Sequence, residues 1–156
     1  MSVTGPPKSP KLPPRWFVRA AWSVHRGLYR ILPGRRALWR QRGKRWGTMR
    51  LTTIGRRTGQ PRAVIVGYVE DGDDLVTLAM NGWANPEPAW WLNLQENPDA
   101  TVELVGGSGR IHAYAATGEE RERLWAEWRK YEPKLDDYAA LRDTETAVVV
   151  LQRRAT

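Results

Sequence analysis

Three arginines and a threonine lie close together in the segment 55–62, which reads GRRTGQPR. Guanidinium groups form paired hydrogen bonds to phosphate and carboxylate groups. The Thr58 hydroxyl adds a donor, and Gly55 and Gly59 allow backbone N–H groups to approach an anion closely. The segment therefore predicts an anion-binding loop, and a solvated basic turn is the alternative.

Side chains suited to acid–base or nucleophilic catalysis are few in the rest of the sequence. The chain has no cysteine and only two histidines, His25 and His112. Neither histidine belongs to an HExxH motif, and the sequence has no GxSxG motif. The sequence thus indicates no metal site and leaves the catalytic residues unknown. An enzyme of this composition would take its reactivity from a bound cofactor.

The positive charge is concentrated in the N-terminal part of the chain. The first 62 residues contain 16 Lys or Arg and no Asp or Glu, whereas the whole chain has a net charge of +8. This asymmetry predicts an anionic partner, which would be a membrane surface, a nucleic acid or an anionic cofactor. Nucleic acid is the least favoured of the three, because no nucleic-acid-binding motif accompanies the charge.

The arginine-rich segment lies between two stretches of strand-like sequence. Short helices are predicted at 89–98, 117–131 and 135–142. Stretches with the composition of strands are found at 48–54, 63–70, 75–80, 100–105, 110–116 and 146–154. The predicted fold is therefore mainly β with peripheral α: a small six-stranded antiparallel β-barrel with outer helices and an N-terminal basic amphipathic helix.

That N-terminal part divides into a tail, a helix and a connector. Residues 1–14 contain five prolines and are predicted to form a disordered tail. Residues 15–32 predict the basic amphipathic helix, which would lie in an anionic lipid interface or pack against its own domain. Residues 35–47 predict a basic connector that could include a short helix. We expect three parts: the tail 1–14, the helix and connector 15–47, and a cofactor-binding barrel domain 48–156.

The hydropathy pattern indicates where in the cell the protein is expected. No apolar run is long enough for a membrane span, and arginines interrupt the N-terminal segment that a signal peptide would need. We therefore expect a cytoplasmic protein, with residues 15–32 in peripheral contact with an anionic membrane at the inner face of the cell membrane. The oligomeric state stays open.

Two motifs resemble those of the deazaflavin-dependent nitroreductase family, whose members are related to the flavin-binding split β-barrels. GRRTGQPR matches the pattern G-R-[KR]-[ST]-G-x-x-R, and PAWWLNLQENP matches P-x-W-x-x-N-L-x-x-N-P. The resemblance spans roughly residues 50–151. It implies the reduced form of coenzyme F420, a 5-deazaflavin with a phosphate and an oligoglutamate tail, as the cofactor.

The resemblance also implies which residues would bind the coenzyme. Its phosphate and acidic tail would be held by Arg56, Arg57, Thr58 and Arg62. The residues beside the ring would be Val64, Ile65, Val66 and Gly67 of the second strand, Ala79, Met80 and Asn81 at the end of the third strand, and Ala89, Trp90, Trp91 and Asn93 of the first short helix.

The substrate side of the predicted pocket departs from the family pattern. Relatives end the third strand in Ser-Lys-Gly-Gly, where this chain reads MNGW at 80–83. Relatives can also carry three tyrosines on the substrate face; Tyr131 and Tyr138 match two of them, and Leu135 takes the middle place. Together with Trp83, these residues predict an apolar substrate pocket.

The sequence is accordingly expected to encode an F420H2-dependent oxidoreductase. It would transfer a hydride to a small, lipophilic acceptor such as a quinone or an unsaturated or nitro compound. The alternative is a non-catalytic protein that binds or sequesters F420, or FMN or haem, in the same barrel.

Overall fold

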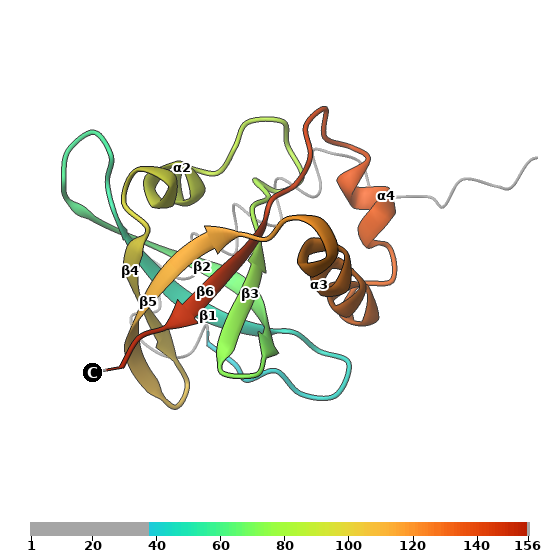
Figure 1. Cartoon of the computed structure of the whole chain (residues 1–156), viewed down its shortest axis with the longest axis horizontal. Coiled ribbons are helices and arrows are strands. Elements are labelled where there is room, and N and C mark those ends of the chain that lie inside the picture. Colours follow the sequence, from blue (N-terminus) through green and yellow to red (C-terminus); the bar gives the residue numbers. More distant parts are fainter. Residues whose placement is uncertain (1–37, 156) are drawn as a thin grey trace, which may run out of the picture.

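The computed structural model describes residues 38–155 of the chain (Figure 1). The tail 1–14 and the predicted helix 15–32 lie outside the described residues. The strands are β1 (Gly47–Ile54), β2 (Pro61–Asp71), β3 (Asp74–Leu78), β4 (Asp99–Leu104), β5 (Gly107–Ala115) and β6 (Val148–Arg153). The helices are α2 (Ala89–Glu96), α3 (Gly118–Tyr131) and α4 (Leu135–Ala139).

The six strands form one closed antiparallel barrel in the order β1-β2-β3-β6-β5-β4. Three hairpins supply the pairs β1–β2, β2–β3 and β4–β5, and β6 returns after α4 to lie between β3 and β5. The pairing of β1 with β4, at Leu51 opposite Val102, closes the barrel. The prediction of a mainly β fold with six antiparallel strands is confirmed.

Alternation along the strands separates the barrel interior from its outside. In β1, Met49 and Leu51 are fully buried, whereas Arg50 and Thr52, which follow them in turn, are partly exposed. This is the period of two that places successive side chains on opposite faces of a sheet.

Helices cover two sides of the barrel (Figure 1). Helix α2 contributes Trp90, Trp91 and Leu94 to the core inside the barrel. Helices α3 and α4 pack against β3 and β6 through a second core, which includes Leu124 and Leu135.

The arginine-rich hairpin is tighter than the sequence predicts. Strand β2 begins at Pro61, paired with Ile54, so that Arg62 lies in the strand and not in the turn. The turn closes because Gly59, with φ of 70°, adopts the left-handed conformation that glycine accepts readily. Its N–H donates to the carbonyl of Gly55 at 2.8 Å.

The short helix considered for 35–47 is absent from its described part. In residues 38–46, the backbones of Arg42 and Arg45 exchange two hydrogen bonds of 2.9 Å across a turn. The N–H of Thr48 in β1 donates to the carbonyl of Trp39 at 3.0 Å, which attaches this turn to the barrel. A helix was the wrong expectation here because Gly43, with φ of 57°, reverses the chain.

Candidate functional site

A cavity of about 650 Å³ follows β2 from the arginine-rich turn to helices α3 and α4. Its walls come from the turn itself, β2, the segment after β3, the start of α2 and the connection between α3 and α4. Segments far apart in the sequence therefore meet around one continuous space.

One end of the cavity is basic. Arg56, Arg57 and Arg62 all line it, together with Thr58. Arg57 and Arg62 are exposed, and neither has an ion pair within the described part of the chain. Two guanidinium groups are thus available to an anionic ligand, and the third is held in place by the protein.

The residue that holds Arg56 is the buried Asn93 of α2. The Asn93 side-chain oxygen accepts hydrogen bonds from the backbone N–H and from Nη1 of Arg56, at 3.1 and 3.2 Å. The Asn93 amide donates to Oγ1 of the buried Thr53 at 3.0 Å. One amide therefore joins the turn, β1 and α2, and it fixes the basic end of the cavity relative to the helix.

The other end of the cavity is aromatic. The Trp83 and Tyr138 rings stack with their centroids 5.9 Å apart and an angle of 12° between their planes. Trp83 has a φ of 61°, which is rare for a residue with a large side chain and is seen mainly at functional sites. Leu135 lies in the same wall, and its side chain is fully buried.

Glycine at position 67 brings two further indole rings close to β2. A Cβ at this position would lie 2.9 Å from Cε3 of Trp46 and 3.6 Å from Cη2 of Trp128. Both tryptophans line the cavity. The absence of a side chain at Gly67 therefore lets these rings pack closely against β2.

Two ionisable groups lie at this aromatic end. Among the described residues that line the cavity, Glu132 is the only carboxylate. Burial, followed by the negative charge of Glu132, raises the pKa of the Tyr138 phenol. A phenol is protonated at neutral pH even with its ordinary pKa of 10.0, so Tyr138 can donate a hydrogen bond into the cavity.

The cavity gathers most of the residues predicted from the sequence. The residues that were predicted to bind the coenzyme and that line the cavity are Arg56, Arg57, Thr58, Arg62, Val64, Ile65, Val66, Gly67, Met80, Asn81, Ala89, Trp90 and Asn93. The residues that were predicted to form the substrate pocket and that line the cavity are Trp83, Leu135 and Tyr138.

Three predicted residues do not line the cavity. Ala79 and Trp91 belong to the core inside the barrel. Trp90 belongs to the same core, but it also lines the cavity, whereas Trp91 does not. The Tyr131 hydroxyl instead accepts a hydrogen bond from the side-chain amide of Gln41.

Other lining residues were missed by reasoning from the sequence. Trp46, Trp128 and Glu132 come from segments outside the two motifs. A tryptophan that walls a cavity has the same sequence context as one in a core, so only the three-dimensional arrangement identifies it.

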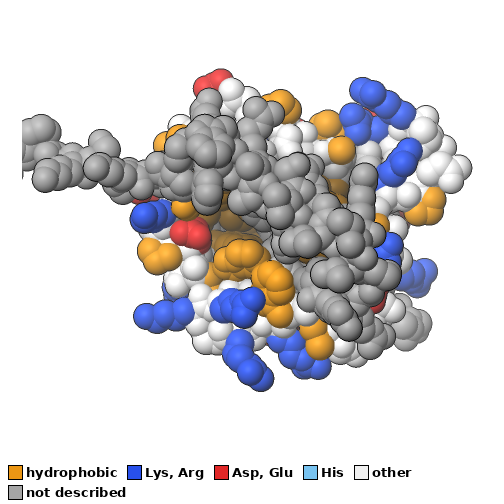
Figure 2. All heavy atoms as spheres, turned by 180° about the vertical axis from the view of Figure 1, so that it is seen from behind, with side chains coloured by type: hydrophobic (Ala, Val, Ile, Leu, Met, Phe, Trp, Pro, Cys, Tyr) orange, Lys and Arg blue, Asp and Glu red, His pale blue; other side chains and the backbone are white. Residues whose placement is uncertain are grey.

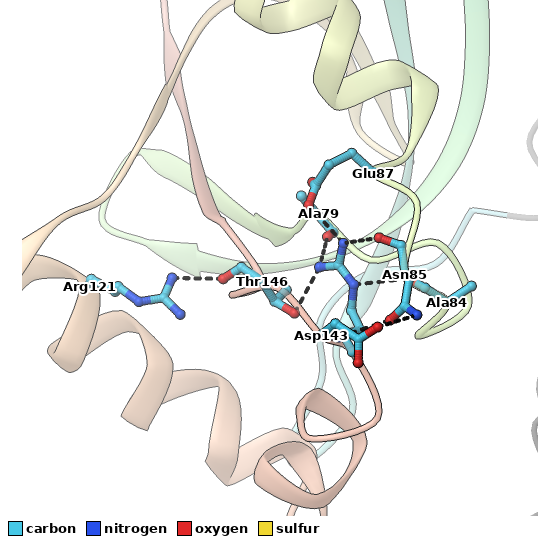
Figure 3. A network of polar contacts seen from close by, with 8 residues as sticks. Ala79, Ala84, Asn85, Glu87, Arg121, Asp143 and Thr146 are labelled. Atoms are coloured by element: carbon cyan, nitrogen blue, oxygen red, sulfur yellow. Dashed lines mark hydrogen bonds and ion pairs between the residues drawn. The ribbon is translucent and has the colours of Figure 1, made fainter.

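Arg142 was also missed, and its contacts anchor the segment after β3; its bonding partners Ala79, Ala84 and Glu87 are labelled in Figure 3. Its side chain is completely buried and forms an ion pair with Glu87 at 2.8 Å. Its guanidinium group donates to the carbonyls of Ala79 and Ala84, each at 3.0 Å. The segment 79–87 is thus tied to the chain that precedes β6.

Further contacts complete this network (Figure 3). Arg142 also donates to Oγ1 of Thr146 at 3.0 Å, and the Thr146 carbonyl accepts from Arg121 at 2.8 Å. Asn85 and Asp143 exchange two hydrogen bonds, at 2.8 and 2.9 Å. Because residues 80–83 line the cavity, the network fixes one of its walls from behind.

Comparison with known proteins agrees with this architecture. A family model described as F420H(2)-dependent quinone reductase matches residues 34–153. The F420H(2)-dependent quinone reductase Rv1261c of Mycobacterium tuberculosis (strain ATCC 25618 / H37Rv) is 32% identical over 109 residues, which cover 67% of this chain and 72% of that protein.

Solved structures show the same barrel. The structure of the F420-H2 dependent reductase FDR-A is 25% identical and superposes with a TM-score of 0.61, over 67% of this chain and 93% of that one. HutZ, the haem storage protein from Vibrio cholerae, is 14% identical with a TM-score of 0.55, over 70% of this chain and 82% of its own, and it shares the fold alone. The family match and the barrel fold together place the chain among the F420-dependent reductases. The chain belongs to the F420H(2)-dependent quinone reductase family.

Proposed function

We propose that this protein uses reduced coenzyme F420 to reduce a small, lipophilic acceptor of the quinone class. The observation that carries this proposal is the single cavity that joins three guanidinium groups at one end to an aromatic pocket at the other. A cofactor with an anionic tail and a flat ring fits such a space, and the family membership of the chain supports the same cofactor.

The basic end would bind the tail of the coenzyme. Arg57 and Arg62, which have no partner among the described residues, would form charge-assisted hydrogen bonds to its phosphate and carboxylates. Arg56 would do so from a position fixed by Asn93. The Thr58 hydroxyl lies at the same end and would add a further contact.

The ring would lie along β2. When bound, the deazaflavin supplies the hydride, so the protein needs no nucleophile of its own. Residues 64–67 and Ala89 would border the ring, and Trp90 would limit its position on the side of α2. Trp46, Trp83 and Trp128 would exclude water from the acceptor, and the Tyr138 phenol would orient an acceptor oxygen by a hydrogen bond.

The segment after β3 makes this pocket differ from those of relatives in charge and polarity. Met80 and Asn81 line the cavity where relatives carry serine and lysine. The charge of that lysine is therefore missing, and the arginine-rich turn would carry the phosphate alone. The thioether of Met80 suits an apolar acceptor.

Turnover with a defined quinone tests the proposal. Purified protein is mixed with reduced F420 and menadione, and oxidation of the coenzyme is followed by its absorbance. We expect oxidation that depends on both the protein and menadione. Tight F420 binding without oxidation of the coenzyme by a panel of quinones and nitro compounds would overturn the assignment and leave a binding protein. Neither that alternative nor FMN or haem as the cofactor is supported by the family match.

We further propose that residues 15–32 contact an anionic membrane, from a cytoplasmic barrel domain formed by residues 48–156. The support is the basic amphipathic pattern of that segment and a surface rich in Lys and Arg, seen from behind in Figure 2. Within residues 38–155, no helix is long and apolar enough to cross a membrane. Sedimentation with vesicles of phosphatidylglycerol tests this contact, and equal sedimentation of a variant that lacks 1–32 would contradict it.

A further inference from the structure

The aromatic end of the cavity carries one negative charge, and this charge bears on which acceptors can enter. Glu132 follows α3 directly and lies in the wall with Trp128 and Tyr138. The backbone N–H of Lys134 donates to its Oε1 at 3.3 Å. No described residue forms an ion pair with Glu132.

The negative charge of Glu132 acts on the Tyr138 phenol, which lines the same pocket. It is the second cause, after burial, of the raised pKa of the Tyr138 phenol. The arginines lie at the opposite end, and the anionic tail of a bound coenzyme would neutralise them. Among the described residues that line the cavity, Glu132 is therefore the one negative charge that an acceptor would meet at this end.

We propose that Glu132 is a specificity-determining residue, which makes the acceptor pocket favour neutral acceptors and reject anionic ones. The inference rests on the proposed function and deepens it, because it names the charge class of the acceptor. An acceptor with a carboxylate or sulfonate would be repelled by Glu132, whereas an uncharged quinone would meet no such repulsion. The carboxylate acts on binding of the acceptor and takes no part in the transfer of hydride.

Two quinones that differ in charge provide the test. Menadione is neutral, and 1,4-naphthoquinone-2-sulfonate carries a negative charge on the same ring system. The ratio of kcat/KM for menadione to kcat/KM for the sulfonate is measured with F420H2 at saturation in the wild type and in Glu132→Gln. Removal of a half-buried like charge should lower this ratio about fivefold, mainly through a lower KM for the sulfonate.

A control variant separates the local effect from a change in net charge. Glu122→Gln removes the same charge from an exposed position of α3 that does not line the cavity. This variant should leave the ratio within about twofold of the wild type. Equal ratios in Glu132→Gln and Glu122→Gln, with turnover intact, would overturn the role of Glu132 and leave the proposed function standing. If wild-type protein reduces neither quinone, both the proposed function and this inference are wrong.

Discussion

At the scale of single residues, the basic end of the cavity combines one fixed and two available guanidinium groups. Arg56 is held by the buried Asn93, whereas Arg57 has no partner among the described residues. Substitution of Arg57 should therefore weaken ligand binding and leave the stability of the fold largely unchanged. Substitution of Asn93 should lower both the affinity for the ligand and the stability of the fold.

For Arg57→Ala we expect F420 to bind about tenfold to hundredfold more weakly, because a lost charge-assisted hydrogen bond is worth about 1.5–3 kcal/mol. The free energy of unfolding should not change, since the side chain is exposed. Isothermal titration calorimetry measures the affinity. Arg110→Ala is the control, because Arg110 is exposed in β5 and does not line the cavity. An equal loss of affinity in both variants would show that only the net charge matters.

For Asn93→Leu we expect the free energy of unfolding to fall by about 3 kcal/mol, as judged by denaturation in urea. The new side chain has a similar volume but leaves the Arg56 N–H and the Thr53 hydroxyl without a partner. Gln95→Leu, on the exposed side of the same helix, should have little effect. A loss below about 1 kcal/mol in Asn93→Leu would mean that water replaces the amide.

At the scale of elements, the segment between β3 and α2 forms a wall of the cavity without being a helix or a strand. Its shape depends on Arg142, which bonds two of its carbonyls and Glu87. The sequence motifs identify the segment as part of the site, but they contain no indication of Arg142, because it lies about 55 residues further along the chain.

For Arg142→Met we expect a loss of about 3 kcal/mol in the free energy of unfolding, because the half-buried Glu87 and the carbonyl of the buried Ala79 would lose their donor. In protein that still folds, KM for the quinone should rise more than the Kd for F420, since Trp83 lies in this segment. Arg129→Ala removes an exposed ion pair with Asp136 and should change stability by less than about 1 kcal/mol. Similar effects of the two variants would contradict the anchoring role.

Strands and motifs could be predicted from this sequence because their signals are local. The alternation in β1 and the Gly59 turn are both readable within a few residues. The contribution of Trp46 and Glu132 to the cavity could not be predicted, because it depends on how α3 packs against β2 and on the close approach that Gly67 allows. Trp91 was placed in the site because it lies inside a motif, although its ring faces the barrel core.

At the scale of the whole molecule, an ion pair joins the barrel to its outer helices. Arg123 of α3 donates two hydrogen bonds to Asp71 at the end of β2, at 2.8 and 3.0 Å. These bonds hold the pKa of Asp71 below its ordinary value of 3.8. A carboxyl with a lowered pKa stabilises the folded state above its ordinary pKa, and this contribution is lost as the pH falls through the lowered value.

The Asp71→Asn variant should therefore unfold at a lower temperature than the wild type near neutral pH. The difference in Tm should shrink as the pH falls below the ordinary pKa of 3.8 and through the lowered pKa of Asp71, and high salt should reduce it at neutral pH. Calorimetry over this range measures it. A difference that stays constant as the pH falls would show that the pair makes no net electrostatic contribution.

The proposed reductase function depends on the binding of F420 in the cavity that follows β2. The most direct measurement is an equilibrium titration of the wild-type protein with F420, followed by the fluorescence of the tryptophans that line this space. We predict saturable quenching at one equivalent with a Kd near the micromolar range, or about −8 kcal/mol. Quenching that shows no saturation up to about a hundred times that concentration would contradict the account.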